Sequence, residues 1–236
     1  MSKKHGPAKT VTTGFVMAAA AAFTMMTGLT NAALAQTAAP AAKPGAMVTG
    51  AMVTGALPPA MVLETARSGD SRPPIGWVEF CAKRAYAAEC AVDTTEALKV
   101  ELTPKLWRTV TSTNVRVNAE IQPITDMDHW GILERWDMAE DGKGDCEEYV
   151  NIKRKRLVEA GIPRRALRIV VVIDEENAGH AVLMLRTDKG DFILDNKRNA
   201  VLPWHQTGYV YIKRESQDRI GWVPLGGVAG PQIAAR

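Results

Sequence analysis

The stretch that decides the fold is residues 144–173, GDCEEYVNIKRKRLVEAGIPRRALRIVVVI, which predicts a helix followed by a buried strand. Asp145 is suited to cap the helix, and Glu148 three residues later completes a capping-box pattern. Gly161 predicts the end of the helix, because glycine is favoured just after the last helical turn. Residues 167–173 are almost wholly apolar and β-branched, which is typical of a strand buried on both faces.

The flanking segments supply more helices on one side and more strands on the other. Helical spacing predicts a short helical piece at 79–89 and a longer helix at 94–121, in which Thr103-Pro104 marks a break or a second start. Downstream, turns rich in glycine and acidic residues separate four further strands. These are expected at 181–186, 191–195, 209–214 and 221–225. Helices first and a sheet afterwards indicate an α+β fold, with helices packed on an antiparallel sheet.

The N-terminus has the pattern of a cleaved signal peptide. A lysine-containing start is followed by a nearly uncharged apolar run at 15–29 and by the small residues of Ala33-Leu34-Ala35. The run is short for a membrane span, so we expect an exported, periplasmic protein without stable membrane insertion rather than an anchored one. The expected organisation is a signal peptide, a low-complexity Ala/Pro/Gly linker, one folded domain and a short tail, at 1–35, 36–72, 73–229 and 230–236.

Charge and composition argue against a nucleic-acid partner. The formal net charge of +3 includes the basic leader, so the mature chain is closer to neutral. The run Lys153-Arg154-Lys155-Arg156 favours a solvated helix face over a patch that binds polyanions.

The three cysteines divide into a pair and a single thiol. Cys81 and Cys90 are close in sequence, and an exported protein meets an oxidising compartment, so we expect them to form a disulfide. Two buried free thiols are the alternative. Cys146 is then the odd cysteine, and a lone thiol in an exported protein is either buried or used in chemistry.

Cys146 begins the predicted helix, where unpaired N–H groups and the helix dipole favour an anion and should lower the pKa of the thiol. His180 begins a predicted strand, and Asp195 ends the next one. Antiparallel pairing therefore brings His180 and Asp195 to the same edge of the sheet, slightly out of strict register. In the triad that this order predicts, Cys146 is the nucleophile, His180 exchanges the proton, and Asp195 orients the imidazole.

Other residues are candidates for supporting or competing roles. The backbone N–H of Cys146 is the expected oxyanion donor, joined by the indole N–H of Trp130 or Trp136. His129 and His205 are alternative bases. Each is the weaker choice, because His129 lies in an irregular loop and His205 beyond the predicted sheet edge.

In combination, several of these motifs resemble the bacterial transglutaminase-like cysteine proteinase family. The segments that carry the resemblance are Gly144-Asp145-Cys146-Glu147-Glu148-Tyr149 with Lys153, Gly179-His180-Ala181-Val182-Leu183, Leu194-Asp195-Asn196, Trp77-Val78-Glu79-Phe80-Cys81 and Ile124-Thr125-Asp126. The resemblance implies a papain/transglutaminase-like fold with Cys146, His180 and Asp195 as nucleophile, base and orienting carboxylate.

The resemblance also implies a metal and partners. In the best-understood branch of the family, a calcium-dependent periplasmic endopeptidase cuts surface adhesins and releases biofilm attachment, and an inner-membrane receptor sequesters the protease. Acidic residues flanking the nucleophile bind the calcium there, and Asp145 and Glu147 occupy those positions here. The alternative is that Asp145 is only a cap and Glu147 only offsets the helix dipole. Zinc and an organic cofactor are not expected.

We therefore expect an exported cysteine endopeptidase that cleaves an envelope protein such as a biofilm adhesin. Two alternatives stay open on the sequence. One is acyl transfer to amines, as in transglutaminases, which the same triad permits. The other is a catalytically silent envelope module that binds a peptide in the cleft.

Overall fold

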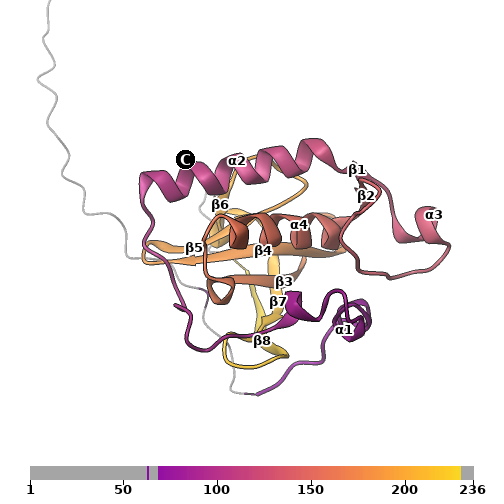
Figure 1. Ribbon diagram of the computed structural model, residues 1–236, viewed down its shortest axis with the longest axis horizontal. Coiled ribbons are helices and arrows are strands. Elements are labelled where there is room, and N and C mark those ends of the chain that lie inside the picture. Colours follow the sequence, from indigo (N-terminus) through magenta and orange to yellow (C-terminus); the bar gives the residue numbers. More distant parts are fainter. Residues whose placement is uncertain (1–62, 64–68, 230–236) are drawn as a thin grey trace, which may run out of the picture. The chain divides into compact units, whose positions relative to one another are not determined.

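A computed structural model describes Leu63 and residues 69–229 (Figure 1). The predicted signal peptide, most of the predicted linker and the predicted tail lie outside the described residues. Within the described part of the chain, none of the helices has the length and apolar character needed to cross a membrane.

In the described residues, six antiparallel strands form one sheet in the order β6-β5-β4-β3-β7-β8. Their bounds are β3 Leu167–Ile173, β4 Gly179–Thr187, β5 Gly190–Leu194, β6 Leu202–Pro203, β7 Val210–Glu215 and β8 Trp222–Ala229. The strand predicted at 167–173 is β3. It lies inside the sheet, because β4 and β7 pair with its two edges. Side chains on both faces of β3 are buried, with Ile169 in one apolar cluster and Val170 and Val172 in another, which explains its largely apolar sequence.

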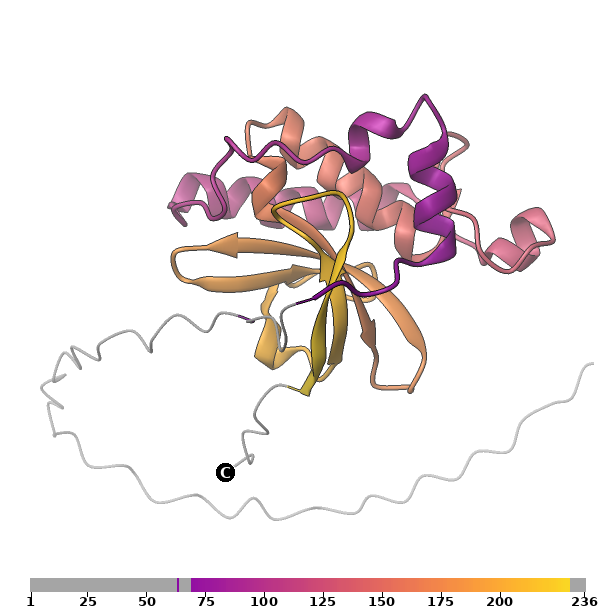
Figure 2. The same ribbon diagram turned by 90° about the horizontal axis from the view of Figure 1, so that it is seen from below.

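Two helices cover one face of this sheet (Figures 1 and 2). They are α2, Pro104–Glu120, and α4, Cys146–Glu159. Val110 of α2 and both Val150 and Leu157 of α4 belong to the core cluster that also contains side chains of β3, β4 and β5. The expected α+β architecture, with helices packed on an antiparallel sheet, is confirmed.

The helix expected from residue 94 begins instead at Pro104. Thr103 is its N-cap, and the Thr103 hydroxyl accepts the backbone N–H of Leu106 at 3.1 Å. Upstream, the Asp93 carboxylate accepts the N–H of Thr95 at 2.8 Å, and Val100 forms a parallel bridge with Thr187. The residues before Thr103 therefore follow the sheet edge instead of coiling.

Short elements connect the helices to the sheet. α1 spans Ile75–Ala82, α3 Asp126–Trp130, β1 Gln122–Pro123 and β2 Lys143–Gly144, with 3-10 turns η1 at Ala87–Cys90, η2 at Arg164–Ala166 and η3 at Trp204–Gln206. β1 and β2 pair in parallel. This pairing fixes the end of α2 beside the start of α4.

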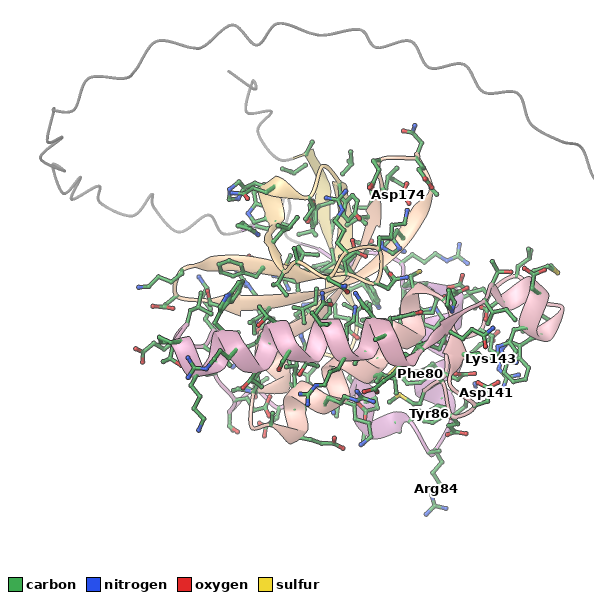
Figure 3. The ribbon with its side chains drawn as sticks, turned by 90° about the horizontal axis from the view of Figure 1, so that it is seen from above. Phe80, Arg84, Tyr86, Asp141, Lys143 and Asp174 are labelled. Atoms are coloured by element: carbon green, nitrogen blue, oxygen red, sulfur yellow. A yellow bond between two sulfur atoms is a disulfide. The ribbon has the colours of Figure 1, made fainter. Side chains whose placement is uncertain are left out.

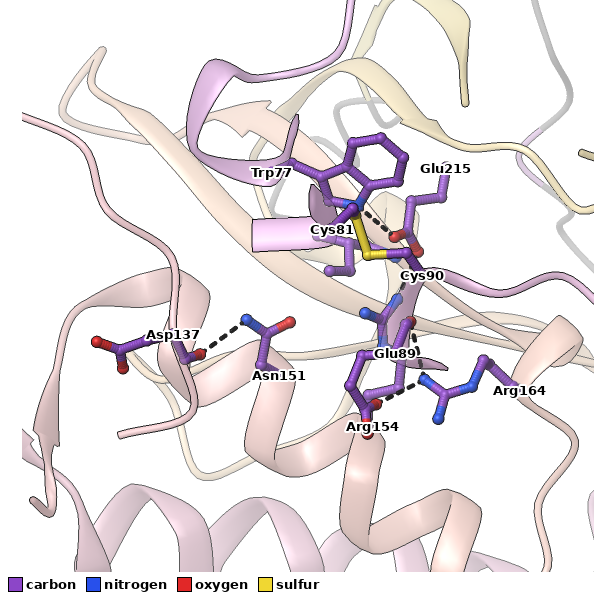
Figure 4. Close-up of a disulfide and its surroundings, with 10 residues drawn as sticks. Trp77, Cys81, Glu89, Cys90, Asp137, Asn151, Arg154, Arg164 and Glu215 are labelled. Carbon is purple, nitrogen blue, oxygen red and sulfur yellow. Dashed lines mark hydrogen bonds and ion pairs between the residues drawn. A yellow bond between two sulfur atoms is a disulfide. The ribbon is translucent and has the colours of Figure 1, made fainter. Parts of the chain in front are cut away.

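The disulfide predicted between Cys81 and Cys90 is confirmed (Figure 4). It joins α1 to η1, and the rings of Phe80 and Tyr86 in the same region stack with their centroids 4.7 Å apart (Figure 3). Trp77 of α1 donates its indole N–H to Glu215 at 2.8 Å, so the disulfide region is attached to β7.

Glu215 also forms a buried ion pair with an arginine of α4, which corrects the expectation for the basic run at 153–156. Arg154 Nη1 lies 2.7 Å from the Glu215 carboxylate, and both side chains are almost fully buried (Figure 4). Lys153 is likewise only 1% exposed. The expectation of a solvated face was wrong for these two residues, whereas Lys155 is exposed.

The other face of the sheet has its own apolar cluster, which includes Val170, Met184 and Tyr211. Leu63, from within the predicted linker, is 2% exposed and joins this cluster, and its N–H donates to Asp191 at 2.8 Å. Ser71 donates its N–H to the carbonyl of Trp222 at 2.8 Å. Parts of the predicted linker therefore belong to the folded domain.

Candidate active site

Cys146 is the first residue of α4, as the sequence predicts, and Asp145 is the N-cap. The N–H of Asp145 donates to the Glu148 carboxylate at 3.0 Å. Glu148 is the third residue of the helix, so this hydrogen bond belongs to the predicted capping box. At Gly144, a Cβ atom would lie 2.6 Å from Cβ of Glu148, so only glycine fits before the cap. These contacts fix the backbone on which the thiol is carried.

His180 and Asp195 come together at the end of the sheet. The register pairs Leu183 of β4 with Leu194 of β5, and one further step places Asp195 opposite Val182. His180 is then a diagonal neighbour on the same face. Its Nε2 lies 2.9 Å from Oδ1 of Asp195, and both side chains are at least 95% buried. The two residues therefore meet by a diagonal contact at one edge of the sheet.

The Asp195 carboxylate has partners on both oxygens. Oδ1 also accepts the N–H of Lys197 at 3.0 Å, while Oδ2 accepts the hydroxyl of Tyr209 at 2.5 Å. Burial acts to raise the pKa of Asp195, but the hydrogen bonds from His180 and Tyr209 outweigh it and hold the pKa below its usual value. Asp195 is therefore a carboxylate, able to accept from the imidazole. The contact of Tyr209 could not be predicted, because the sequence pattern indicates only that Tyr209 begins a strand.

Cys146 and His180 line the same cavity of about 230 Å³. Its other walls come from the residue before α1, the loop before α4, α4 itself and strands β3, β4 and β7, through Pro74, Glu134, Trp136, Glu147, Val171, Gly179, Ala181 and Lys213. The N–H of Ala181 donates to Sγ of Cys146 at 3.4 Å, which ties the thiol to β4 next to His180. Nε2 of the imidazole is engaged by Asp195, so Nδ1 is the nitrogen left for proton exchange with a group in the cavity.

The environment of the thiol differs from the expectation. Sγ of Cys146 donates to Oε2 of Glu147 at 2.8 Å. Burial raises the pKa of Cys146 well above its usual value, and the negative charges of Glu147 and Asp145 raise it further. The prediction that the helix N-terminus lowers this pKa was wrong, because burial and the two carboxylates outweigh the dipole.

Four acidic side chains crowd around the helix start. The ligand atoms of Asp145, Cys146 and Glu147 lie within 4.8 Å of one another, and so do those of Asp126, Asp145 and Glu148. Burial, reinforced by the neighbouring carboxylates, raises the pKa of Glu147 and of Glu148. Oδ1 of Asp145 is buried and has no hydrogen-bond partner among the described residues. An unpartnered carboxylate oxygen inside a group of oxygen donors fits a hard divalent cation.

The remaining sequence candidates take other places. Trp136 lines the cavity, but its indole N–H donates to Glu134 at 2.8 Å. Trp130 is 40% exposed and lies outside the set of described residues that line the cavity. The Nε2 of His129 bonds to Asp141 at 2.8 Å, and His205 lies in η3. Of the histidines in the described residues, His180 is the one that lines this cavity.

Comparisons with known proteins show the family of the chain. The family model of the bacterial transglutaminase-like cysteine proteinases matches residues 67–229. No curated protein sequence matches the chain.

Among solved structures, calcium-bound Legionella pneumophila LapG is 22% identical with a TM-score of 0.45, over 59% of this chain and 77% of that chain. Another structure of Legionella pneumophila LapG is 24% identical with a TM-score of 0.44, over 55% and 73% of the two chains. The EGTA-treated form of the same protein is 24% identical with a TM-score of 0.44, over 54% and 69%. Because the family model spans most of the sequence, the chain belongs to the bacterial transglutaminase-like cysteine proteinases and is a cysteine peptidase.

Proposed function

We propose that this cysteine peptidase is an exported endopeptidase that hydrolyses an envelope protein through Cys146, His180 and Asp195. One observation carries the proposal. His180 is hydrogen-bonded to the buried Asp195 carboxylate and shares a cavity with Cys146, the thiol at the start of α4. The arrangement supplies a nucleophile, a base and an orienting group from three separate elements.

The chemistry follows from which atoms are free. Nδ1 of His180 takes the proton from the Cys146 thiol, and the thiolate attacks the carbonyl carbon of the scissile peptide bond. The backbone N–H of Cys146, in the first turn of α4, stabilises the oxyanion that forms. The imidazolium then gives its proton to the leaving amine, and water hydrolyses the thioester to restore the thiol. Asp195 keeps Nε2 protonated throughout and stabilises the imidazolium.

A calcium site beside the nucleophile is part of the proposal. Asp145 and Glu147 would hold the ion, with Asp126 and Glu148 close enough to contribute oxygens. A cation bound there supplies positive charge that offsets the carboxylates around the thiol. Glu147, once engaged as a ligand, no longer accepts the hydrogen bond from Sγ of Cys146, and the thiol is left to His180.

Export and an envelope substrate rest on the signal-peptide pattern of residues 1–35 and on the family resemblance. A large surface adhesin is the proposed substrate, and an inner-membrane receptor is the proposed regulatory partner.

Proteolysis is tested by incubating an envelope extract with the wild-type protein, C146A or H180A, in calcium. We expect new protein N-termini, found by mass spectrometry, with the wild type and none with either variant, because each variant removes a group needed for acylation. Uptake of a labelled amine into envelope proteins, without new N-termini, would instead assign acyl transfer. Identical extracts in all three incubations would leave a peptide-binding module as the function.

The calcium site has a test that does not depend on activity. Because burial and the neighbouring carboxylates raise the pKa values of Glu147 and Glu148, calcium competes with protons for these groups, so binding should release protons and should tighten as the pH rises. Calorimetry with calcium in buffers of different ionisation enthalpy measures the release. E147Q should weaken binding at least tenfold, whereas E159Q, on the exposed end of the same helix, should bind as the wild type does. Equal affinity for E147Q and the wild type would rule out this site.

A further inference from the structure

Tyr209 is an aromatic neighbour of the proposed triad, and its position is set by the turn before β7. Gly208 has φ of +83°, a conformation that favours glycine, and it turns the chain toward the sheet. The N–H of Tyr209 donates to the Thr207 hydroxyl at 3.3 Å. The following residue, Val210, pairs with Ile173 of β3. The backbone of Tyr209 is therefore held on both sides.

The side chain of Tyr209 reaches two members of the triad. Its hydroxyl donates to Oδ2 of Asp195 at 2.5 Å, and its ring meets the imidazole of His180 edge to face, with centroids 5.9 Å apart at 83°. Only 1% of Tyr209 is exposed. The phenol therefore occupies the one oxygen of Asp195 that His180 does not use.

We propose that Tyr209 is a positioning residue that fixes the Asp195 carboxylate so that Oδ1 stays directed at Nε2 of His180. The inference rests on the proposed function, since it assigns a role within that triad. A carboxylate can rotate about its Cβ–Cγ bond and exchange its oxygens, and a donor fixed on Oδ2 opposes this rotation. The edge-to-face contact also limits the tilt of the imidazole.

Two electrostatic features fit this role. Burial raises the pKa of Tyr209, and the adjacent Asp195 raises it further, so the phenol remains a hydrogen-bond donor over the whole working pH range. The guanidinium of Arg198 lies over the Tyr209 ring, 5.6 Å from its centroid, and pairs with Glu175 at 2.6 Å. Arg198 thus packs against the ring and helps to hold it in place.

The test compares Y209F with Y211F. Tyr209→Phe keeps the ring against His180 and removes only the hydroxyl on Asp195. Tyr211→Phe is the matched control, since Tyr211 is also buried but donates its hydroxyl to the carbonyl of Trp204 at 3.0 Å. Peptide hydrolysis is measured as kcat and KM across pH, and the Nε2–H signal of His180 is followed by NMR, with H180A for assignment.

In Y209F we expect kcat to fall roughly tenfold or more, the size of a weakened general acid–base step, with KM changed less than about twofold. The acid limb of kcat/KM should move to higher pH, because Asp195 loses a hydrogen bond that lowers its pKa. The Nε2–H signal should shift upfield and exchange faster with water. Y211F should match the wild type in all these measurements.

An unchanged kcat and NMR signal in Y209F would overturn the inference, as would a change in KM alone, which would make Tyr209 a substrate contact. A loss of activity that Y211F shares equally would also overturn it, since it would reflect a general loss of packing. If the wild type hydrolyses no peptide, the proposed function fails. The NMR comparison, made on the resting protein, then decides alone whether Tyr209 holds Asp195 and His180 together.

Discussion

Lys153 lies on the buried side of α4, one of the least expected places for a lysine. Burial lowers the pKa of its ammonium to about 7, although the negative charge of Asp195 acts in the opposite direction. Nζ of Lys153 lies over the ring of Tyr149, 5.6 Å from its centroid. Keeping this group charged in the folded protein therefore costs free energy at neutral and acid pH.

This cost predicts a pH-dependent contribution to stability. Between about pH 7 and pH 10.5 the unfolded chain binds a proton at Lys153 that the folded protein does not, so the free energy of unfolding rises with pH across this window. One unit of pKa shift corresponds to about 1.4 kcal/mol, so the whole rise is on the order of 5 kcal/mol. Below pH 7 the penalty is present in full.

Urea unfolding of K153M and the wild type between pH 6 and pH 10 measures this contribution. We expect the difference between the two to be largest at the acid end, with K153M the more stable, and to shrink as the pH rises. K155M, with its side chain on the exposed side of the same helix, should follow the wild type. Parallel curves for K153M and the wild type would contradict the assignment.

At the residue scale, the chain order of Cys146, His180 and Asp195 could be predicted because each has a local signal, a helix cap or a strand end. The environment of each residue could not. The hydrogen bond from Cys146 to Glu147 and the burial of the thiol depend on how α4 packs against β4, and Tyr209 reaches Asp195 from 14 residues away. Contacts between distant segments leave no pattern in either segment alone.

At the scale of single elements, the sequence succeeded where the signals are local. α4 begins and ends as predicted because its cap and its terminal Gly161 act within one turn of the chain. The segment 94–102 was misassigned as helix because its apolar spacing is helical, but Leu102 donates its N–H to Asp188 at 2.8 Å and Val100 joins β4. Tertiary hydrogen bonds here override local preference.

The shortest elements carried too little signal to be predicted. β1 and β2 are two residues each and form only as partners of one another. α1 was expected later in the chain, and it contacts the cavity wall through Gly76, where a Cβ would lie 2.4 Å from the Trp136 ring. That close approach explains why glycine occupies a helix, where it is otherwise unfavourable.

At the scale of the whole molecule, the order of helices and strands predicted the α+β class, because segments with helical spacing come first and short, turn-bounded strand segments follow. The order β6-β5-β4-β3-β7-β8 was only partly implied, since β7 pairs with β3 rather than with β5, which precedes it more closely in sequence. Leu63 on the second face of the sheet was also unexpected, because its surroundings in sequence resemble a linker.

The same scale explains how one cavity gathers the proposed chemistry. α4 presents Cys146, β4 presents His180, and the residue after β5 is Asp195, so the three depend on the packing of one helix against one end of the sheet. The disulfide leaves Cys146 as the chain's free cysteine, all three cysteines being described. Reaction at Cys146 can therefore be measured without interference from the other two.

The rate at which iodoacetamide alkylates Cys146 in calcium, between pH 6 and pH 9, tests most directly whether Cys146, His180 and Asp195 act as one unit. We predict that the wild type reacts faster at pH 7 than a free cysteine does, because the imidazole takes the proton from the thiol, and that H180A reacts at least tenfold more slowly. A chelator should lower the alkylation rate of the wild type, because without calcium the Cys146 thiol donates its hydrogen bond to Glu147 and not to His180. Equal rates for the wild type and H180A across the whole pH range would contradict the account.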